Sequence, residues 1–338
     1  MSSPSQRTTS SSPLALFARR IFPWLITVAC FAYLYTKLAG AAAREGESLL
    51  VYLSGVFGKV SWGSWLALMI PYSLFFFLID SVIVWRVVNW FNARVRYTDI
   101  LPIRGSSYIL SLLDERVGKG AMALYLNRRD GVPGWEVGSS MLFIMFCEFY
   151  YLLSWAVLGY LLSAESLPDE FRVIPGIAVG AALLFVVLVA FFSGRLGVGQ
   201  TLRNRPILRA FRLAKPWHYG AIILLRSPAM LGAVFVYTLA LRLFDIEIRY
   251  AAMLGYLPVI FFGAATPGPM RSVAITLWVA LFPGHEGEMT AFGFAQHNFF
   301  IFFNAAIGLV FLRRANRELF ASNPSTSRRD SPDPQGIG

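Results

Sequence analysis

The chain has 338 residues, of which 56% are hydrophobic and only 14% are charged, and its mean hydropathy is +0.57. A soluble domain of this length needs more charge on its surface, so the composition excludes an ordinary soluble protein. The net charge of +11 does not indicate a nucleic-acid partner, because the basic residues gather in alternate loops and at both termini. That distribution is typical of membrane proteins, whose cytoplasmic loops are rich in Lys and Arg.

The N-terminal part of the chain predicts a cytoplasmic tail followed by two membrane spans. Residues 1–20 are polar and serine-rich, a composition that predicts a disordered segment. The apolar run 21–38 predicts the first span. A secretory signal is the alternative, since small residues that could be cleaved follow at 41–43. The second span is predicted at 62–88, and the basic residues after it place its end in the cytoplasm.

Residues 101–135 are apolar in pieces and contain no uncharged stretch of about 18 residues, so they make a poor full span. Basic residues flank both ends, which predicts a helical hairpin that enters from the cytoplasm and returns there. The interruption consists of charged residues and two glycines, namely Asp114, Glu115, Arg116, Gly118, Lys119 and Gly120. We expect the glycines to act as hinges, and Arg116 and Lys119 to bind an anionic substrate. The alternative is a solvated loop with internal ion pairs, which is favoured for the two acidic residues.

Three further full spans are predicted at 136–162, 173–193 and 227–244. The loop after the first of them is acidic, whereas the loop after the second is the most basic in the chain. Because basic loops stay in the cytoplasm, these two loops set the direction in which each span crosses.

A second interrupted segment, residues 250–284, has two apolar arms of about 11 to 15 residues, each too short to cross a bilayer alone. Pro267, Gly268 and Pro269 break the helix between the arms. Irregular backbone inside a bilayer must line protein or a watery cavity, so these hinge residues predict a hairpin tip beside a cavity. Arg271 then begins the second arm, where its guanidinium and the helix N-terminus favour an anion. The alternative is that Arg271 reaches lipid headgroups from a shallow loop.

The last span is predicted at 290–312 and a polar tail at 321–338, with both termini cytoplasmic. Six full crossings agree with the positive-inside rule only if each interrupted segment returns to the side it entered from. The predicted fold is therefore an all-α membrane helix bundle with about six full spans and two re-entrant helical hairpins. It forms a single transmembrane domain over residues 21–320.

The order of these elements predicts an inverted repeat. One repeat covers about 21–162 and the other about 173–312, and the second runs through the membrane in the opposite sense, as in many secondary transporters. Residues 119–136 align without gaps with residues 271–288, which pairs Lys119 with Arg271 and Glu136 with Glu288. This short match supports the repeat less than the topology does.

Polar residues inside the predicted spans are further candidates for binding a substrate. Glu148 lies near the centre of an apolar run, where an unpaired carboxylate costs about 3 kcal/mol, so it is expected to face the bundle interior or be protonated. Asp80 is similar but lies nearer the cytoplasm. His297 and Asn304 are seven residues apart and so share one helix face. For all four, the alternative is a structural hydrogen bond between helices.

The runs "DERVGKGAMALYLNRRDGV" and "TPGPMRSVAITLWVALF" resemble the two hairpins of the lysylphosphatidylglycerol synthase transmembrane, or flippase-like, family of bacterial membrane proteins. The resemblance covers about residues 20–315. Arg116 and Gly118 match the first family element, and Pro267 and Gly268 match the second. It implies the movement of a polar lipid headgroup between leaflets of a bacterial cytoplasmic (inner) membrane. The chain holds no soluble segment for the aminoacyl-transferase domain of the full-length synthases.

The sequence departs from that family at several motif positions. Asp114 and Glu115 stand where a proline is usual, Pro269 replaces a glycine, and Ala274 stands where a glutamate is usual. The substrate and the activity that the resemblance implies therefore do not follow from these motif positions alone.

The leading hypothesis is a flippase-like transporter that moves a polar or anionic lipid, either a phospholipid or a lipid-linked precursor. One alternative is a membrane-embedded enzyme that acts on a lipid-linked substrate, with Glu148 or Asp80 as acid or base. Another is a non-catalytic partner in envelope lipid or polysaccharide assembly. The expected partners are membrane lipids, with a membrane protein or a second copy of the chain as further candidates. No cofactor is expected, and the Cys and His spacings of a metal site are absent.

Overall fold

The computed structural model describes residues 13–113, 122–124, 126–128, 131–195, 197, 199–265 and 271–320, with side chains from residue 24 to residue 312 except at 110–113. This part of the chain forms helices and turns without strands. Within it, six helices are long and apolar enough to cross a membrane. They belong to α1 (Pro13–Arg44), α3 (Trp62–Phe91), α6 (Gly134–Ser163), α7 (Ile174–Phe192), α10 (Pro216–Arg242) and α13 (Glu286–Phe320). The predicted all-α class and the six helices long and apolar enough to span a membrane are confirmed for the described residues.

Shorter helices pack between the spans or join them. They are α2 (Leu49–Lys59), α4 (Tyr97–Leu113), α8 (Gln200–Arg203), α9 (Arg209–Leu213), α11 (Tyr250–Ala265) and α12 (Ser272–Leu281), with single 3-10 turns at η1 (Ala164–Ser166), η2 (Asp169–Val173) and η3 (Pro206–Leu208). The sequence predicts no counterpart of α2, which packs on α13 at one end of the bundle. Burial there, together with the negative charges of Glu288 and Glu286, raises the pKa of Tyr52 on α2.

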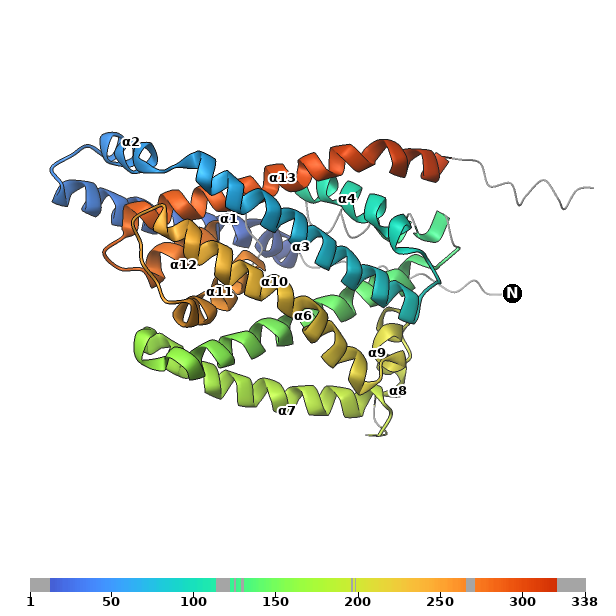
Figure 1. The fold of residues 1–338 in the computed structure, drawn as a ribbon. Helices are drawn as coiled ribbons and strands as arrows, with labels where there is room; N and C mark the ends of the chain where they lie inside the picture. The colour runs from blue at the N-terminus through green and yellow to red at the C-terminus, as the bar shows by residue number, and fades with distance from the viewer. Residues whose placement is uncertain are drawn as a thin grey trace, which may run out of the picture.

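The two ends of the bundle differ in charge (Figure 1). At the end drawn on the right, α3 passes to α4, and α7 passes through α8 and α9 to α10. We call this the basic end, because its loops contain Arg94, Arg96 and the basic residues between 195 and 215. At the opposite end α6 passes to α7, α10 to α11 and α12 to α13. We call it the acidic end, since it holds Glu165, Asp169, Glu170, Asp245, Glu247, Glu286 and Glu288.

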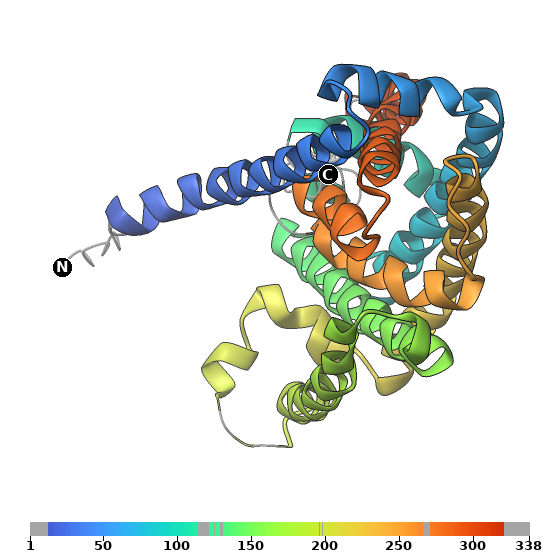
Figure 2. The ribbon, with the colours of Figure 1, turned by 90° about the vertical axis from the view of Figure 1, so that its left-hand side faces the viewer.

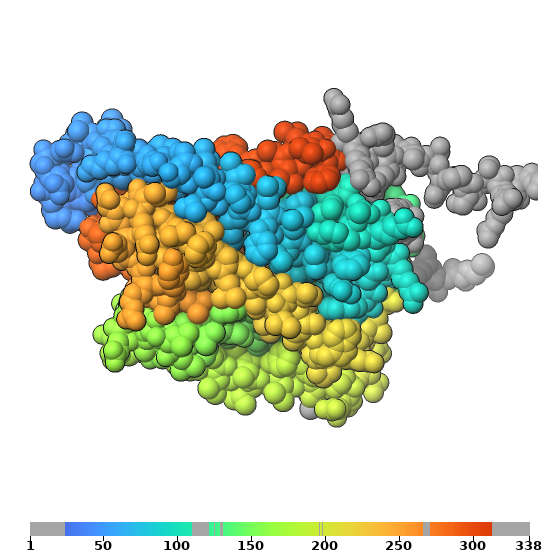
Figure 3. Space-filling view, viewed as in Figure 1, coloured from blue at the N-terminus to red at the C-terminus, as the bar shows by residue number. Residues whose placement is uncertain are grey.

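The central helices of the bundle pack in pairs. α3 and α10 lie side by side across one face, with α7 along its lower edge (Figure 3). α4 packs most extensively on α13, and α11 packs most extensively on α6. α7 is apolar on all its faces, and only Ile174 and Ala181 of it are buried, as expected for a helix whose surroundings are lipid.

Two apolar cores fill the bundle, one toward each end. On α3, α6 and α10 the core of the acidic end reaches Tyr72, Tyr151 and Met230. On the same three helices the core of the basic end reaches Ile83, Cys147 and Ile222. Between these limits each helix carries one charged side chain, so the charges lie where the two cores meet.

Two expected helix boundaries are wrong. The sequence predicts a fifth span from residue 227, whereas α10 begins at Pro216 and includes Arg226. The helix continues through Arg226 because carboxylates on neighbouring helices neutralise its charge. The last span is predicted from residue 290, whereas α13 begins at Glu286, whose carboxylate pairs with Arg44 of α1 at 2.9 Å.

The C-terminal part of α1 belongs to the bundle. Ala41 and Ala42, the residues of the candidate cleavage site, are both buried, and α1 packs on α12, α13 and α2. Viewed from the acidic end, the N-terminal part of α1 projects away from the other helices (Figure 2). The contacts of α1 with three helices favour the membrane-span prediction over the secretory signal.

The basic loop between α7 and α10 folds back onto the bundle. Arg209 of α9 pairs with Glu136 at the start of α6 and donates to the carbonyl oxygen of Phe91 at 2.7 Å. The backbone N–H of Ala210 donates to the hydroxyl of Ser139 at 2.8 Å. These bonds hold α3, α6 and α9 together at the basic end.

The two interrupted segments contain short helices. In the second segment α11 and α12, of 16 and 10 residues, pack on each other at the acidic end (Figure 1). In the first segment α4 has 17 residues, and helical turns follow at 122–124 and 126–128. The predicted hinges lie outside the described residues; they are Gly118, Gly120, Pro267, Gly268 and Pro269.

Candidate functional site, a charged layer inside the helix bundle

Four charged side chains from four helices meet inside the bundle. Arg104 of α4 donates from Nε to Oδ2 of Asp80 on α3 at 2.5 Å. Arg226 of α10 donates from Nη2 to Oε1 of Glu148 on α6 at 2.7 Å, and the same nitrogen lies 3.9 Å from Oδ1 of Asp80. We call Asp80, Arg104, Glu148 and Arg226 the charged layer. The charges alternate in sign along it and sum to zero.

The charged layer lies at membrane depth. An α-helix rises 1.5 Å per residue, so Arg226 lies about 15 Å from the start of α10, Asp80 about 16 Å from the end of α3 and Glu148 about 21 Å from the start of α6. All three distances are measured from the basic end. The hydrocarbon core of a bilayer is about 30 Å thick, so these groups lie near its middle. A charge there must be paired, and the layer pairs each of them.

Two tyrosines complete the surroundings of the arginines. The hydroxyl of Tyr108 donates to Oδ2 of Asp80 at 3.1 Å, and the Arg104 guanidinium lies 4.8 Å from the centroid of the Tyr108 ring. The Arg226 guanidinium lies 5.8 Å from the centroid of Tyr151. Cations are attracted to the faces of aromatic rings, so both contacts add to the ion pairs.

The members of the layer differ in how accessible they are. The side chains of Asp80 and Arg226 are 7% and 8% exposed, whereas that of Glu148 is 40% exposed. Nη1 of Arg226 is buried and donates to none of the described residues. A guanidinium has five N–H donors, so Arg226 can bind a further acceptor without giving up Asp80. Glu148 is the partner that an incoming anion can reach and replace.

Tyr72 of α3 links the charged layer to a second polar group of side chains. Its hydroxyl donates to the carbonyl oxygen of Ala229 at 3.4 Å, and it interacts electrostatically with Arg226. On the other side its ring lies 5.6 Å from that of Tyr237, whose hydroxyl accepts from Nε2 of Gln296 at 2.7 Å. Tyr72 therefore lies between Arg226 of the charged layer and the Tyr237–Gln296 hydrogen bond, within the core of the acidic end.

His297 lies next to Gln296 on α13, and we call Tyr237, Gln296 and His297 the neutral layer. His297 is 1% exposed, and neither ring nitrogen has a hydrogen-bond partner among the described residues. The same holds for Oε1 of Gln296 and for Oδ1 of Asn304, two turns further along α13. Hydrogen bonds between helices were the alternative for His297 and Asn304, and these polar atoms make none of them.

Arg271 is the N-cap residue of α12 and has φ of 50°, a left-handed conformation that is uncommon outside glycine. The next residue, Ser272, is buried and donates to the hydroxyl of Thr27 on α1 at 3.4 Å. The Arg271 side chain is exposed, yet its charge acts on both His297 and Tyr237. Arg271 therefore lies beside the neutral layer and is open to the surroundings, which fits both of its sequence interpretations.

The structure thus brings Asp80 and Glu148 together and places Arg271 near His297. Arg116 and Lys119 lie outside the described residues. Among the residues that the structure does describe, no group of three or more His, Cys, Asp or Glu side chains could hold a metal ion.

Sequence reasoning missed the two arginines that hold the site together. The sequence places Arg104 only among the basic residues that follow the second predicted span, and the fifth predicted span begins at residue 227, just after Arg226. The signal was present in the run "AIILLRSPAM", where a lone arginine interrupts apolar residues. A buried carboxylate in one span and a buried arginine in another are natural partners, so Asp80 and Glu148 together indicate such a cation.

Comparisons with known proteins return no match: no protein-family model, no curated protein and no solved structure resembles the chain at a significant level. The resemblance to the flippase-like family stays a prediction. The charged layer is therefore interpreted from its own geometry.

Proposed function

We propose that the chain is a flippase-like transporter that moves a polar or anionic lipid between the leaflets of a bacterial cytoplasmic membrane. The observation that carries the proposal is the charged layer, in which Arg226 lies at mid-membrane depth with one buried N–H group unused. A membrane protein retains such costly groups where a polar substrate or ion passes. An anionic headgroup is the ligand that a guanidinium recognises best.

Glu148 acts as the exchangeable counter-charge in this proposal. It pairs with Arg226, and its side chain is the most exposed of the four in the charged layer. A headgroup phosphate or carboxylate entering the layer replaces Glu148 as the acceptor of the Arg226 N–H groups. The displaced Glu148 then takes up a proton or turns toward water, which lowers the cost of an unpaired carboxylate. Arg104 meanwhile keeps Asp80 neutralised.

Helix packing supports the inverted repeat on which this transporter plan rests. If α3, α4 and α6 correspond to α10, α11 and α13, then the pairing of α4 with α13 corresponds to the pairing of α11 with α6. These are the two most extensive helix pairs, and α3 packs on its own counterpart α10. A two-fold relation between the halves produces this pattern.

Glycines at the two helix crossings add to that support. A Cβ on Gly159 of α6 would lie 2.4 Å from the backbone nitrogen of Gly255 on α11. A Cβ on Gly308 of α13 would lie 2.8 Å from the carbonyl oxygen of Gly105 on α4. Each crossing is thus a close approach of two backbones that only glycine permits.

The re-entrant hairpins and the orientation belong to the same proposal. α12 is about 15 Å long, half the thickness of the hydrocarbon core, so α11 and α12 together enter from the acidic end and return to it. α4 and the turns after it do the same from the basic end. The positive-inside rule makes the basic end cytoplasmic, and with it both termini.

Transport in liposomes tests the proposal. The full-length protein is reconstituted with a fluorescent phosphatidylglycerol or phosphatidylcholine, and the fraction in the outer leaflet is followed by chemical quenching. We expect the protein to accelerate movement of the anionic lipid. Arg226→Gln should abolish the acceleration, whereas Arg172→Gln, a change in an exposed ion pair at the acidic end, should leave it intact.

Other results of the liposome experiment would refute the transporter or favour one of the alternative functions. No acceleration across anionic, zwitterionic and lipid-linked sugar substrates would refute the transporter. A chemically altered lipid under the same conditions would favour the membrane enzyme. Copurification of one membrane protein without either activity would favour the assembly partner.

A further inference from the structure

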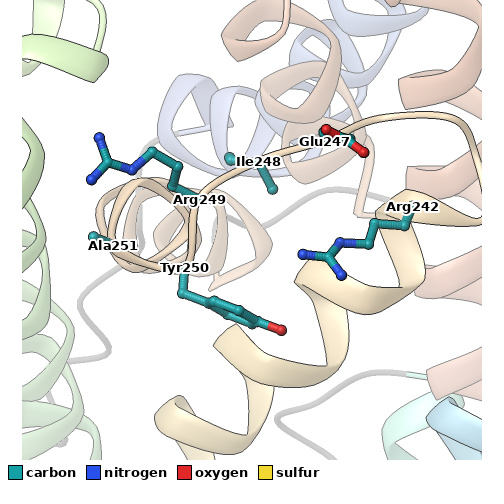
Figure 4. A pocket seen from close by; sticks show the side chains of 6 residues that line it. All are labelled: Arg242, Glu247, Ile248, Arg249, Tyr250 and Ala251. Carbon is teal, nitrogen blue, oxygen red and sulfur yellow. The ribbon is translucent and has the colours of Figure 1, made fainter.

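A hollow lies far from the charged layer, at the acidic end where α10 ends and α11 begins (Figure 4). Its volume is about 610 Å³, within the range of about 300–1,000 Å³ common to small-molecule sites. It is lined by Arg242, Glu247, Ile248, Arg249, Tyr250 and Ala251. The transport proposal uses none of these residues.

The loop that frames the hollow is firmly anchored. Phe244 and Ile246 are buried in the core of the acidic end, and between them Asp245 takes a left-handed conformation with φ of 59°. This turn carries the chain from the last residue of α10 to the first residue of α11. The positions of Arg242 and Tyr250 are therefore fixed by packed helices at both ends of the loop.

Two charged groups of the hollow, Arg242 and Glu247, have no partner among the described side chains. Neither Arg242 nor Glu247 forms an ion pair or hydrogen bond through its side chain with any described residue, although Arg44 and Arg172 at the same end each pair with a carboxylate. The Arg242 guanidinium points toward the Tyr250 ring, and the Glu247 carboxylate lies across the loop from it, while Arg249 points to the other side (Figure 4). On the side of Tyr250 the hollow thus presents one cation, Arg242, and one anion, Glu247, and neither pairs with another described side chain.

An apolar stripe continues from the hollow toward the middle of the membrane. The ring of Phe235 on α10 stacks on that of Tyr250, with centroids 6.1 Å apart and an interplanar angle of 8°. Phe235 is 55% exposed, and Leu231, one turn further along α10, is exposed on the same face. A tyrosine at the membrane boundary above such a stripe is typical of a site where headgroups meet acyl chains.

We propose that this hollow binds a zwitterionic phospholipid of the adjoining leaflet. The phosphate accepts hydrogen bonds from the Arg242 guanidinium and the Tyr250 hydroxyl, and the ammonium of the headgroup donates to Glu247. One acyl chain lies along Phe235 and Leu231. An anionic lipid without an amine satisfies only Arg242 and leaves Glu247 repelling it, so the pair of opposite charges selects the zwitterion.

Lipid binding to the full-length protein in detergent tests this site by native mass spectrometry, independently of transport. The probes are phosphatidylethanolamine, phosphatidylglycerol with the same acyl chains, and inorganic phosphate. We expect phosphatidylethanolamine to bind more tightly than phosphatidylglycerol. Arg242→Gln should weaken phosphatidylethanolamine binding about tenfold, as for the loss of one charge-assisted hydrogen bond. Glu247→Gln should remove the preference between the two lipids. Arg172→Gln should change neither.

Three results would overturn the site. These are equal binding of both lipids to the unmodified protein, unchanged binding to Arg242→Gln, and full displacement of lipid by an equal concentration of inorganic phosphate, which would assign the hollow to a soluble anion. A thermal unfolding scan of Arg242→Gln separates lost binding from lost folding. Because no leaflet exchange is measured, the site can fail while the transport proposal holds, and the reverse.

Discussion

The charged layer and the neutral layer lie in the same bundle but differ in whether their buried polar groups have partners. In the charged layer each ionised group has an oppositely charged partner within 4 Å. In the neutral layer His297 is more deeply buried, yet neither of its ring nitrogens has a hydrogen-bond partner among the described residues. An unpaired charge at this depth is far more costly than an unpaired neutral group. Disrupting the charged layer should therefore cost stability, whereas disrupting the neutral layer should cost mainly function.

Arg226→Met should have the largest effect, because it leaves Glu148 without a partner and removes one of two cations beside Asp80. We expect the free energy of unfolding, measured by SDS titration in bicelles, to fall by about 3 kcal/mol. The control Arg172→Met removes an exposed pair and should change it by less than about 0.5 kcal/mol. Equal effects of the two substitutions would mean that burial of the layer contributes nothing.

Gly159→Ala tests the close crossing of α6 and α11. The added methyl meets the backbone of Gly255, which cannot move aside as a side chain can, so α6 and α11 must separate. A loss of about 2 kcal/mol is expected in the same titration, typical of overpacking. The matched control is Gly176→Ala on α7, where a Cβ meets nothing within 4 Å. If both variants unfold alike, the α6–α11 crossing is looser than described.

Glu148→Gln should have a smaller effect, since its side chain is 40% exposed and the amide still accepts a hydrogen bond from Arg226. A loss of about 1 kcal/mol is expected. Combined with Arg226→Met, the same change should cost nothing further, because it removes the carboxylate left unpaired. A double-mutant cycle measures this coupling. Strictly additive losses would show that Glu148 and Arg226 do not act as a pair.

His297→Leu should have the smallest effect on stability. It removes two buried nitrogens that have no partner and keeps an apolar side chain of similar bulk, so the free energy of unfolding should stay level or rise. Gln296→Leu is the contrasting control, since it leaves the Tyr237 hydroxyl without its hydrogen bond. Stable His297→Leu protein with reduced lipid transport would place the neutral layer on the transport path. A clearly destabilised variant would contradict the comparison of the two layers.

Much of the fold could be predicted from local composition. Runs of apolar residues determine the spans at α3, α6 and α7 to within a few residues. About twenty apolar residues in a row favour the bilayer interior, where only a helix satisfies all the backbone N–H and C=O groups within the segment. The short arms α11 and α12 also follow from the proline and glycine residues between them. The start of α10 could not be predicted in this way. An arginine beside an apolar run usually marks the end of a span, and only the carboxylate partners of Arg226 explain why the helix continues through it.

Only the two acidic residues of the candidate site could be predicted from the sequence. Asp80 and Glu148 stand out as acidic residues in apolar runs, but they are 68 positions apart and nothing in either run names its partner. The unpartnered state of His297 is likewise invisible to a sequence, since it depends on what neighbouring helices present to its ring.

The sequence by itself determined that this chain is a membrane bundle, which end of it is basic, and that a few polar groups must lie within it. Hydrophobic length and charge distribution act along the chain, so a linear reading captures them. Only the tertiary structure decided that Asp80, Arg104, Glu148 and Arg226 form one charged layer without net charge, and that Arg242 and Glu247 pair with none of the described side chains. Those outcomes depend on which helices cross and at what height, and the crossings are set by side-chain packing between segments far apart in the chain.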